Sequence, residues 1–302
     1  MKPGWTTRAI GRHLVDLPAN AELYETYTVN QDKLELLPIK TRADFDGIVF
    51  TREQQLKKTL HQERKESMFI ERVNLPNGSV ILISWKPYSE NLFFDNYFLI
   101  GNKAIKYSGG VDPGKKEVIL KLHRELNEEW CELRSGEIPE GVGFVAEDVM
   151  LVDKRFNLES WSLVARFPGK PALNFKVNAF TQRVLEPGLR ERVSSGLADS
   201  ALSYLGQVLS GKSTLRNRKR PVGPIEADEI LLAATQNGRR GYAFTWEAQG
   251  KTRSLAEPNL VVELNDGIHE QTSPPSFKDD DEALALWDAI IDSIRLRPGA
   301  AG

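Results

Sequence analysis

The sequence predicts an α+β protein built from two tandem, possibly duplicated units, each a largely antiparallel sheet with helices packed on it. Short apolar segments, many of them alternating, recur along the chain and are separated by Gly, Pro and Asn turns. Residues 117–133 and 281–296 each end such a series as an amphipathic helix whose apolar stripe contains one Trp. A sheet with its helices on one face suits this order of elements.

The first unit is expected to contain three short strands, a helix, four strands and the helix at 117–133. The strands are expected at 11–17, 23–29, 33–39, 69–75, 79–86, 92–100 and 103–108. The helix is expected over 51–68, where Thr51 and Gln54 approximate a capping box and Leu56 and Leu60 share a face. In the helix at 117–133 the apolar stripe is Ile119, Leu122, Leu126 and Trp130.

The segment 135–141, SGEIPEG, is the best linker candidate, and after it a similar order restarts. Strands are expected at 143–152, 159–167, 171–180, 226–235, 241–247 and 259–265, with a helix over 187–209. The pair Asn237-Gly238 marks a hairpin turn. We therefore expect an N-terminal α/β domain over residues 1–137 and a C-terminal α/β domain over residues 138–302.

Composition limits the functional class. The chain has 302 residues, with 40 Lys and Arg against 42 Asp and Glu and a net charge of −2, so it is not a basic platform for nucleic acid. No apolar run of about 18 residues is present, so no membrane span is expected. The N-terminus lacks a secretory apolar core, which fits either a cytosolic protein or a periplasmic protein whose signal peptide was removed. The single cysteine, Cys131, is expected to pack rather than react.

Residues 206–213, GQVLSGKS, match the nucleotide-binding P-loop pattern letter by letter. That pattern needs a strand before it and a buried helix after it, so that backbone N–H groups can surround phosphate. Here the preceding residues favour a helix, and the following residues, 216–220, are RNRKR before Pro221. We therefore expect no nucleotide and no other cofactor.

No catalytic or metal-binding constellation is recognisable. His13, His61, His123 and His269 are not at metal-ligand spacing from one another or from the cysteine, and His123 is expected at the surface. No GxSxG nucleophile motif is present. The acidic run 279–282 precedes a helix, where carboxylates favour the positive end of the helix dipole. The chain is therefore interpreted as a non-enzymatic protein.

Candidate partner contacts come from exposed aromatic and arginine side chains, which often anchor protein interfaces. In the first unit they are Tyr88 and Phe93, assigned to the loop after Trp85. In the second they are Arg216 and Arg218, assigned to a polar loop before Pro221. Core packing for the aromatic cluster, and solvation for the basic one, are the alternatives for these four residues.

Three C-terminal segments carry a family resemblance. They are GPIEADEILLAATQNGRRGYAFTWEAQGK (223–251), EPNLVVEL (257–264) and DEALALWDAIIDSIRLRPGA (281–300), and GRHLVDLPANAEL (11–23) adds to them. Together they resemble the immunity proteins of bacterial type VI secretion systems that neutralise secreted lipase or phospholipase effectors. The resemblance implies a two-domain periplasmic protein that binds its cognate effector and blocks access to the effector's active site.

Two other functions stay open at this stage. One is an enzyme whose site is unrecognised, and the other is a periplasmic adaptor without a toxin partner. A lipase effector gene beside this one would favour the immunity function over both.

Overall fold

The computed structural model describes residues 2–195, 213–236, 238–266 and 274–302. The chain divides into two compact units. Unit 1 consists of residues 1–26, 138–142 and 154–302, and unit 2 of residues 27–137 and 143–153. The α+β class with mostly antiparallel sheets is confirmed.

Unit 2 contains two helices and a sheet with the strand order β3-β4-β8-β7-β6-β5. Its elements are β3 (Glu22–Val29), which is shared with unit 1, β4 (Asp32–Leu36), α1 (Arg42–Lys58), β5 (Phe69–Asn74), β6 (Val80–Trp85), β7 (Leu92–Ile100), β8 (Lys103–Val111) and α2 (Lys116–Glu128). A small sheet of β9 (Trp130–Glu132), β10 (Phe144–Ala146) and β11 (Val149–Leu151) completes the unit.

Unit 1 has the strand order β14-β15-β16-β17-β13-β12-β3. Its elements are β12 (Glu159–Arg166), β13 (Leu173–Phe180), α3 (Leu189–Ser194), β14 (Ser213–Lys219), β15 (Asp228–Gln236), β16 (Arg239–Ala248), β17 (Asn259–Asp266) and α5 (Asp280–Ile291). A small sheet joins both chain ends through β1 (Trp5–Ile10), β2 (His13–Pro18) and β18 (Arg295–Leu296).

The two main sheets have the same topology, which supports the expected duplication. In each main sheet two strands precede a helix, four antiparallel strands follow it, and a second helix comes next. In each, the last of the four strands pairs with the second of the first two, as β8 with β4 and β17 with β13. Each main sheet therefore has two strands before its first helix, where three were expected.

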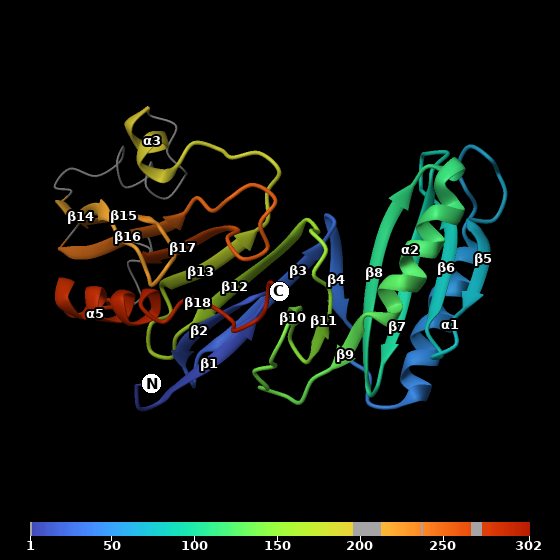
Figure 1. Ribbon diagram of the computed structural model, residues 1–302, viewed down its shortest axis with the longest axis horizontal. Helices are drawn as coiled ribbons and strands as arrows, with labels where there is room; N and C mark the ends of the chain where they lie inside the picture. Colours follow the sequence, from blue (N-terminus) through green and yellow to red (C-terminus); the bar gives the residue numbers. More distant parts are fainter. Residues whose placement is uncertain (1, 196–212, 237, 267–273) are drawn as a thin grey trace. The chain divides into compact units, whose positions relative to one another are not determined.

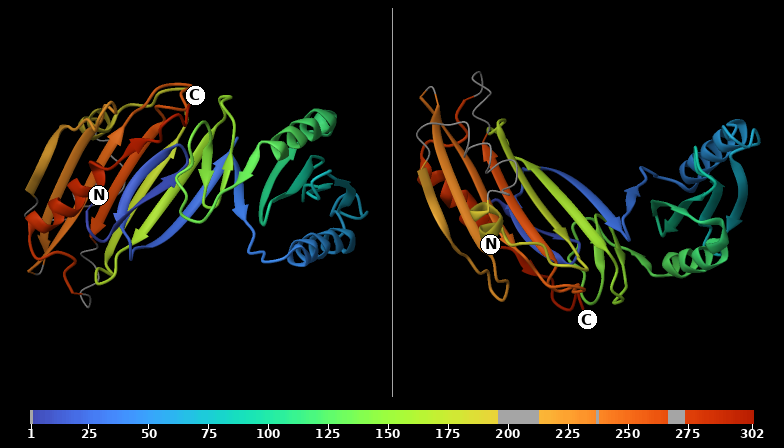
Figure 2. Two further views of the ribbon diagram at one scale, coloured as in Figure 1. Left: turned by 60° about the horizontal axis from the view of Figure 1, so that its bottom comes forward. Right: turned by 90° about the horizontal axis from the view of Figure 1, so that it is seen from above.

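Helices cover both faces of each sheet, so the expectation of one covered face is wrong. In unit 2, α1 packs on Val80 and Leu82 of β6, while His123 of α2 packs on Phe94 of β7 from the opposite face. Figure 2 shows α1 and α2 on opposite sides of these strands. In unit 1, α3 packs on Ile230 and α5 on Phe244 through Trp287, again on alternate positions of the strands.

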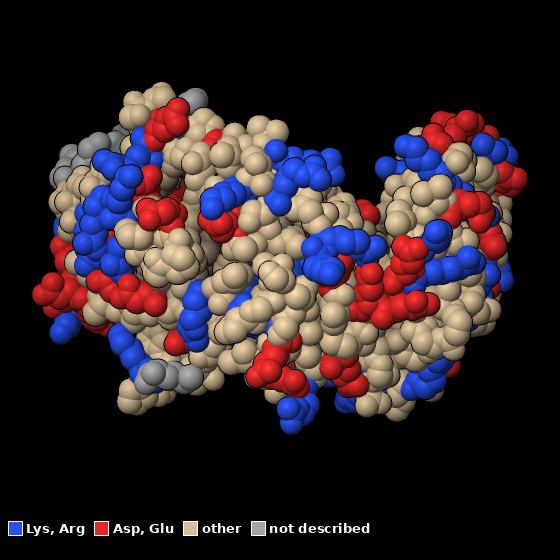
Figure 3. Space-filling view, viewed as in Figure 1, with Lys and Arg blue, Asp and Glu red and all other residues tan. Residues whose placement is uncertain are grey.

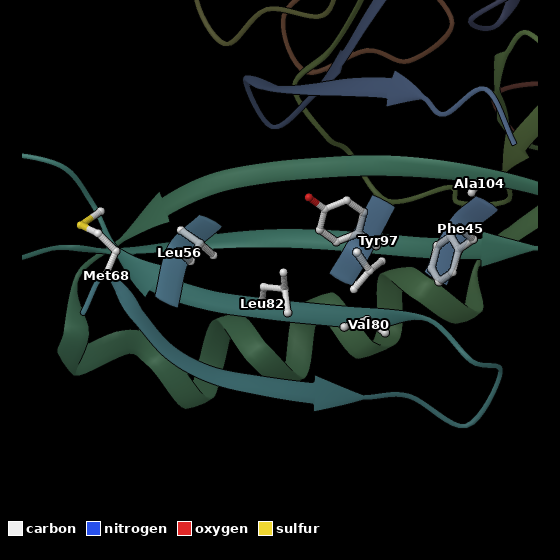
Figure 4. Packing of buried hydrophobic residues seen from close by; sticks show 8 residues of the cluster. Phe45, Leu56, Met68, Val80, Leu82, Tyr97 and Ala104 are labelled. Carbon is white, nitrogen blue, oxygen red and sulfur yellow. The ribbon is translucent and has the colours of Figure 1, made fainter. Parts of the chain in front are cut away.

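The core beneath α1 shows why the helix begins earlier than expected (Figure 4). Phe45, Val49 and Leu56 pack against the sheet, and Phe45 is completely buried. Thr41 caps the helix by accepting a hydrogen bond from the backbone N–H of Asp44, whose carboxylate binds the Thr41 N–H in return. This capping box outweighs the approximate one at Thr51, so the expected start of the helix was wrong.

Three further expectations are corrected. Trp130 and Cys131 lie on β9 instead of the preceding helix, because the helix ends at Glu128. The expected strand 143–152 is the hairpin of β10 and β11. Residues 216–219 belong to β14 instead of a loop, since they pair with β15. Residues 1–26 lie in the same unit as the C-terminal residues. The domains 1–137 and 138–302 as separable pieces stay a prediction.

Two buried arginines hold distant parts of unit 1 together. Arg12, in the turn of the β1–β2 hairpin, makes two bonds of 2.7 and 2.8 Å to Glu159 of β12 and also donates to the carbonyl of Ala300. Arg297 donates to the carbonyls of Pro139 and Gly141, both at 2.7 Å. The N-terminal hairpin, a strand, the C-terminal residues and the segment that enters unit 1 at Ile138 are thereby fixed.

The neighbouring Gly11 is needed at this turn. Its φ is 55°, a left-handed conformation that favours glycine, and a Cβ there would lie 2.2 Å from the ring of Trp161. The hairpin therefore approaches β12 closely, which brings Arg12 within reach of Glu159.

We predict that Glu159→Gln lowers the free energy of unfolding by about 3 to 5 kcal/mol, because the Arg12 guanidinium is left buried without its counter-charge. Urea unfolding at neutral pH measures this change. The matched control is Asp46→Asn, which breaks the exposed Arg42–Asp46 pair and is expected to cost about 1 kcal/mol or less. Equal losses from the two variants would contradict the assigned role of the Arg12–Glu159 pair.

Candidate functional site

Tyr88 lies where it was expected, on the loop between β6 and β7. Its side chain is 71% exposed, and its hydroxyl accepts a 3.1 Å hydrogen bond from the amide of Gln62. Its φ of 56° is unusual for a residue with a side chain and costs conformational free energy. Such strain persists only where the surroundings impose it.

Those surroundings are the neighbouring loop 60–67. The ring of His61 is buried and its Nε2 lies 3.1 Å from the carbonyl oxygen of Ser89. The guanidinium of Arg64 stacks 3.9 Å from the ring centroid of Trp85. Contacts between the loops 60–67 and 86–91 therefore hold this end of unit 2 in place, with Tyr88 exposed to solvent.

Phe93 was assigned to the same loop, and that placement is wrong. It lies on β7, paired with Ser84 and Gly110, and is partly buried. The strand begins at Leu92 because Lys86 N–H bonds to the carbonyl of Asn91, which closes the loop one residue earlier. Phe93 therefore offers a contact less readily than Tyr88.

Arg216 and Arg218 lie on β14, and both are engaged within unit 1. Arg216 makes two bonds of 2.6 and 2.8 Å to Asp288 of α5. Arg218 bonds at 2.9 Å to Glu229, a completely buried carboxylate on β15. Burial alone would raise the pKa of Asp288, but the hydrogen bond and charge of Arg216 hold that pKa below its usual value. Figure 3 shows basic atoms over these strands beside acidic atoms over α5.

The structure thus separates the four candidates by availability. The Arg216 side chain is 21% exposed and bound to a carboxylate on both nitrogens, whereas Arg218 is 47% exposed. The basic run 216–220 is therefore mainly part of the β14–α5 packing. The sequence pattern did not predict these ion pairs, because Glu229, Asp288 and the arginines lie far apart along the chain.

Helix α2 turns part of its expected apolar stripe outward. Leu122 of that stripe is 46% exposed, and Val118, outside the stripe, is 63% exposed, while the buried residues of the helix include His123 and Asn127. The expectation that His123 lies at the surface is wrong for the same reason, because its ring packs edge-on against Phe94 and Tyr107. An apolar periodicity identifies a stripe but not which face is covered.

A cavity of about 440 Å³ lies in unit 1 between the loop before α3 and the ends of β15 and β16. Its lining is rich in charged groups, among them Lys219, Glu226, Asp228, Lys251 and Glu257. The lining contains no Ser, Thr or Cys, and its charged and amide groups can hold a polar group of a partner.

Across the described parts of the chain, no group of three His, Cys, Asp or Glu side chains could hold a metal ion. Within the same ranges no helix is long and apolar enough to cross a membrane. Residues 206–212 of the P-loop-like sequence, and His269, lie outside the described residues. The absence of nucleotide binding therefore stays a prediction. The acidic cap is confirmed, because the Asp279 side chain accepts from the N–H of Glu282.

Comparison with known proteins places both parts of the chain in one group. The model of the Tle cognate immunity protein 4 N-terminal domain matches residues 6–116, and that of the C-terminal domain matches residues 137–299. No curated protein sequence matches the chain.

Solved structures match almost the whole chain. The apo structure of the immunity protein TplEi of the T6SS from Pseudomonas aeruginosa is 33% identical, with a TM-score of 0.90, and 99% of each chain is covered. A crystal structure of a Tle4–Tli4 complex is 31% identical, with a TM-score of 0.90 and coverage of 99% and 100%. TplEi complexed with an "L" peptide is 32% identical, with a TM-score of 0.86 and the same coverage.

A pH response follows from the two buried histidines that have lowered pKa values. Burial lowers the pKa of His123 in unit 2 to about 4. Burial, together with the charge of Arg12, lowers the pKa of His13 in unit 1 to about 4. Since the unfolded chain binds these protons near pH 6.5, stability is complete above that pH and is lost as the pH falls toward 4.

For His123 alone the loss between pH 7.5 and pH 5 is expected to be about 2 kcal/mol. We predict that His123→Leu reduces the pH dependence of urea unfolding by about that amount. Asn127→Ala is the control, because it alters the same buried face of α2 without removing a titrating group. An unchanged pH dependence in His123→Leu would contradict the assignment.

Proposed function

The chain belongs to the Tle cognate immunity protein 4 family, and on that premise we propose that it binds a type VI-secreted lipase or phospholipase effector and blocks access to its active site. It thereby protects the cell that produces both proteins. The observation that carries the proposal is the 31% identity, over 99% of this chain, to the structure of a Tle4–Tli4 complex. Both domain models match, over residues 6–116 and 137–299, so the resemblance is not confined to one part of the chain.

Inhibition by capture needs no chemistry from the inhibitor. As an immunity protein the chain is not an enzyme, and its candidate residues are suited to contact. Two units on one chain can supply two contacts, and the second contact then forms at high effective concentration. The proposed contacts are Tyr88 and Phe93 from unit 2, and Arg216 and Arg218 from unit 1.

The geometry ranks these four contacts. Tyr88 is exposed and its hydroxyl is held by Gln62 of the neighbouring loop, so binding has little of this side chain left to order. Arg216 would have to leave Asp288 to bind a partner, whereas Arg218 keeps half its surface in solvent. Tyr88 is therefore the strongest of the four and Arg216 the weakest.

We also propose that the protein acts in the periplasm, where it meets an effector delivered by a neighbouring cell. The resemblance to effector-neutralising proteins supports this compartment. Osmotic-shock fractionation of the producing bacterium tests it: the protein should accompany a periplasmic marker, and recovery with a cytosolic marker alone would contradict the proposal.

We predict that the purified protein and the effector encoded beside its gene form a complex on size-exclusion chromatography. Calorimetric titration gives its Kd, and a lipase from an unrelated organism serves as the negative control. Failure of the two cognate proteins to associate would contradict the proposed function and favour an adaptor without a toxin partner.

The same titration separates a contact residue from a structural one. Tyr88→Ala is expected to weaken binding by about 2 kcal/mol, roughly 30-fold, with unfolding unchanged. Arg216→Ala is expected to lower the unfolding free energy, because Asp288 loses its strongest partner. Dividing the chain at residue 137 is a poorer test, since it would separate β1 and β2 from β18.

A further inference from the structure

Three exposed apolar side chains lie close together in sequence at the end of β13. Phe180, Val184 and Leu185 are 41%, 75% and 45% exposed. Large apolar side chains that remain in solvent as a group often mark an interaction surface. Here they adjoin a turn that the structure holds firmly, which makes accidental exposure a poor explanation.

Two buried polar residues just before Val184 and Leu185 fix the position of this turn. The Thr181 hydroxyl donates to the carbonyl of Asn157 at 2.8 Å and accepts from the N–H of Glu159 at 2.9 Å. The Gln182 amide donates to the carbonyl of Gln249 at 2.6 Å. Both residues are only 7% exposed, so the following residues, 183–187, are directed into solvent. A surface ordered in advance loses little conformational entropy on binding.

A second loop adds a positive charge beside this segment. The N–H of Arg253 donates to the carbonyl of Gln182 at 2.7 Å, and Arg253 has a φ of 53°. Its guanidinium lies 5.2 Å from the ring centroid of Phe156, a contact that orients the charge without neutralising it. Together, Arg183, Val184, Leu185 and Arg253 are named here the arginine–apolar patch.

Within the described ranges the two arginines of this patch have no carboxylate partner, although Glu186 of the same segment is also exposed. The nearby Lys251, by contrast, is paired with Glu257 at 2.8 Å. Figure 3 shows an uncharged surface with basic atoms beside it over the loop after β13. Arginine next to apolar side chains is typical of the centre of protein interfaces.

We propose that the arginine–apolar patch is a contact surface of unit 1 for the effector, and that it receives an apolar area bordered by carboxylates. The inference rests on the proposed function and adds a binding surface to it. The two aliphatic side chains would be buried against the partner, while Arg183 and Arg253 pair with its acidic groups. The opposite charge gives specificity and speeds association, and the apolar pair gives the larger share of affinity.

An anionic membrane is the other partner that this chemistry could suit. Two aliphatic side chains bury little apolar surface, and stable binding to a bilayer normally requires a further strong anchor such as a lipid chain or a polybasic segment. A protein face also matches the fixed geometry of the two loops, whereas fluid lipid would not require it. The effector is therefore the favoured occupant.

The first test uses the double variant Val184→Asp with Leu185→Asp in the full chain, titrated calorimetrically against the cognate effector. Two carboxylates placed in an apolar contact, opposite acidic groups, are expected to weaken the Kd about 30-fold or more. Val118→Asp with Leu122→Asp on α2 is a matched control, with the same residue types and exposures of 63% and 46%. Thermal unfolding of both double variants should equal that of the unaltered chain.

The second test reverses the charges with Arg183→Glu and Arg253→Glu. Binding is expected to weaken at least tenfold at low salt, and its salt dependence should decrease because favourable pairs have been removed. Sedimentation with vesicles containing one third phosphatidylserine measures the membrane alternative. The proposal expects no bound protein.

The outcomes separate the patch from the function. If the unaltered chain does not bind the effector, the proposed function and the patch both fail. If it binds and the patch variants bind equally well, or the α2 control loses as much affinity, the patch is wrong while the function stands. Vesicle binding that the patch variants abolish, with effector affinity unchanged, would also overturn it.

Discussion

The arrangement of unit 1 depends on the burial of two arginines. Arg12 reaches Glu159 and the carbonyl of Ala300, and Arg297 reaches the carbonyls of Pro139 and Gly141. A buried guanidinium is tolerated when its donors find acceptors, so these residues constrain one another strongly. They come from both chain ends, from a strand and from the segment that enters the unit, so the complete set of contacts in unit 1 needs both ends of the chain.

The repeated topology explains how such a chain can act as a binding protein. In each unit helices cover both faces of the sheet, so the apolar faces of the sheet are buried in the core. The loops between the strands are then available to contact a partner. The exposed groups that remain are therefore informative. Tyr88 on one unit and the arginine–apolar patch on the other are both held by hydrogen bonds to a neighbouring loop of the same unit. Fixed loops on a covered sheet suit recognition of a partner, because little conformational entropy is lost on binding.

Local sequence patterns predicted most strands and the family. They failed where contacts with residues distant in the sequence determine the structure of a segment. The apolar run at 92–100 is a strand with those same bounds, and the strands expected before and after the Asn-Gly turn, β15 and β16, are paired. The basic run 216–219 reads as a loop, yet it forms β14, because buried Glu229 and Asp288 supply its counter-charges. The apolar stripe of α2 could not be oriented, since only the packing of His123 on Phe94 shows which face is inward. Similarly, nothing local in Val184 or Leu185 distinguishes exposed residues from core.

The central claim is inhibition by stoichiometric capture, and a titration of effector lipase activity tests it most directly. Fixed effector, at a concentration well above the Kd, is mixed with increasing amounts of this protein, and hydrolysis of phospholipid is followed. The account predicts a linear fall to no activity at a fixed molar ratio, unchanged by longer incubation. Complete inactivation by a small fraction of an equivalent, growing with time, would show catalysis by this chain and contradict the account.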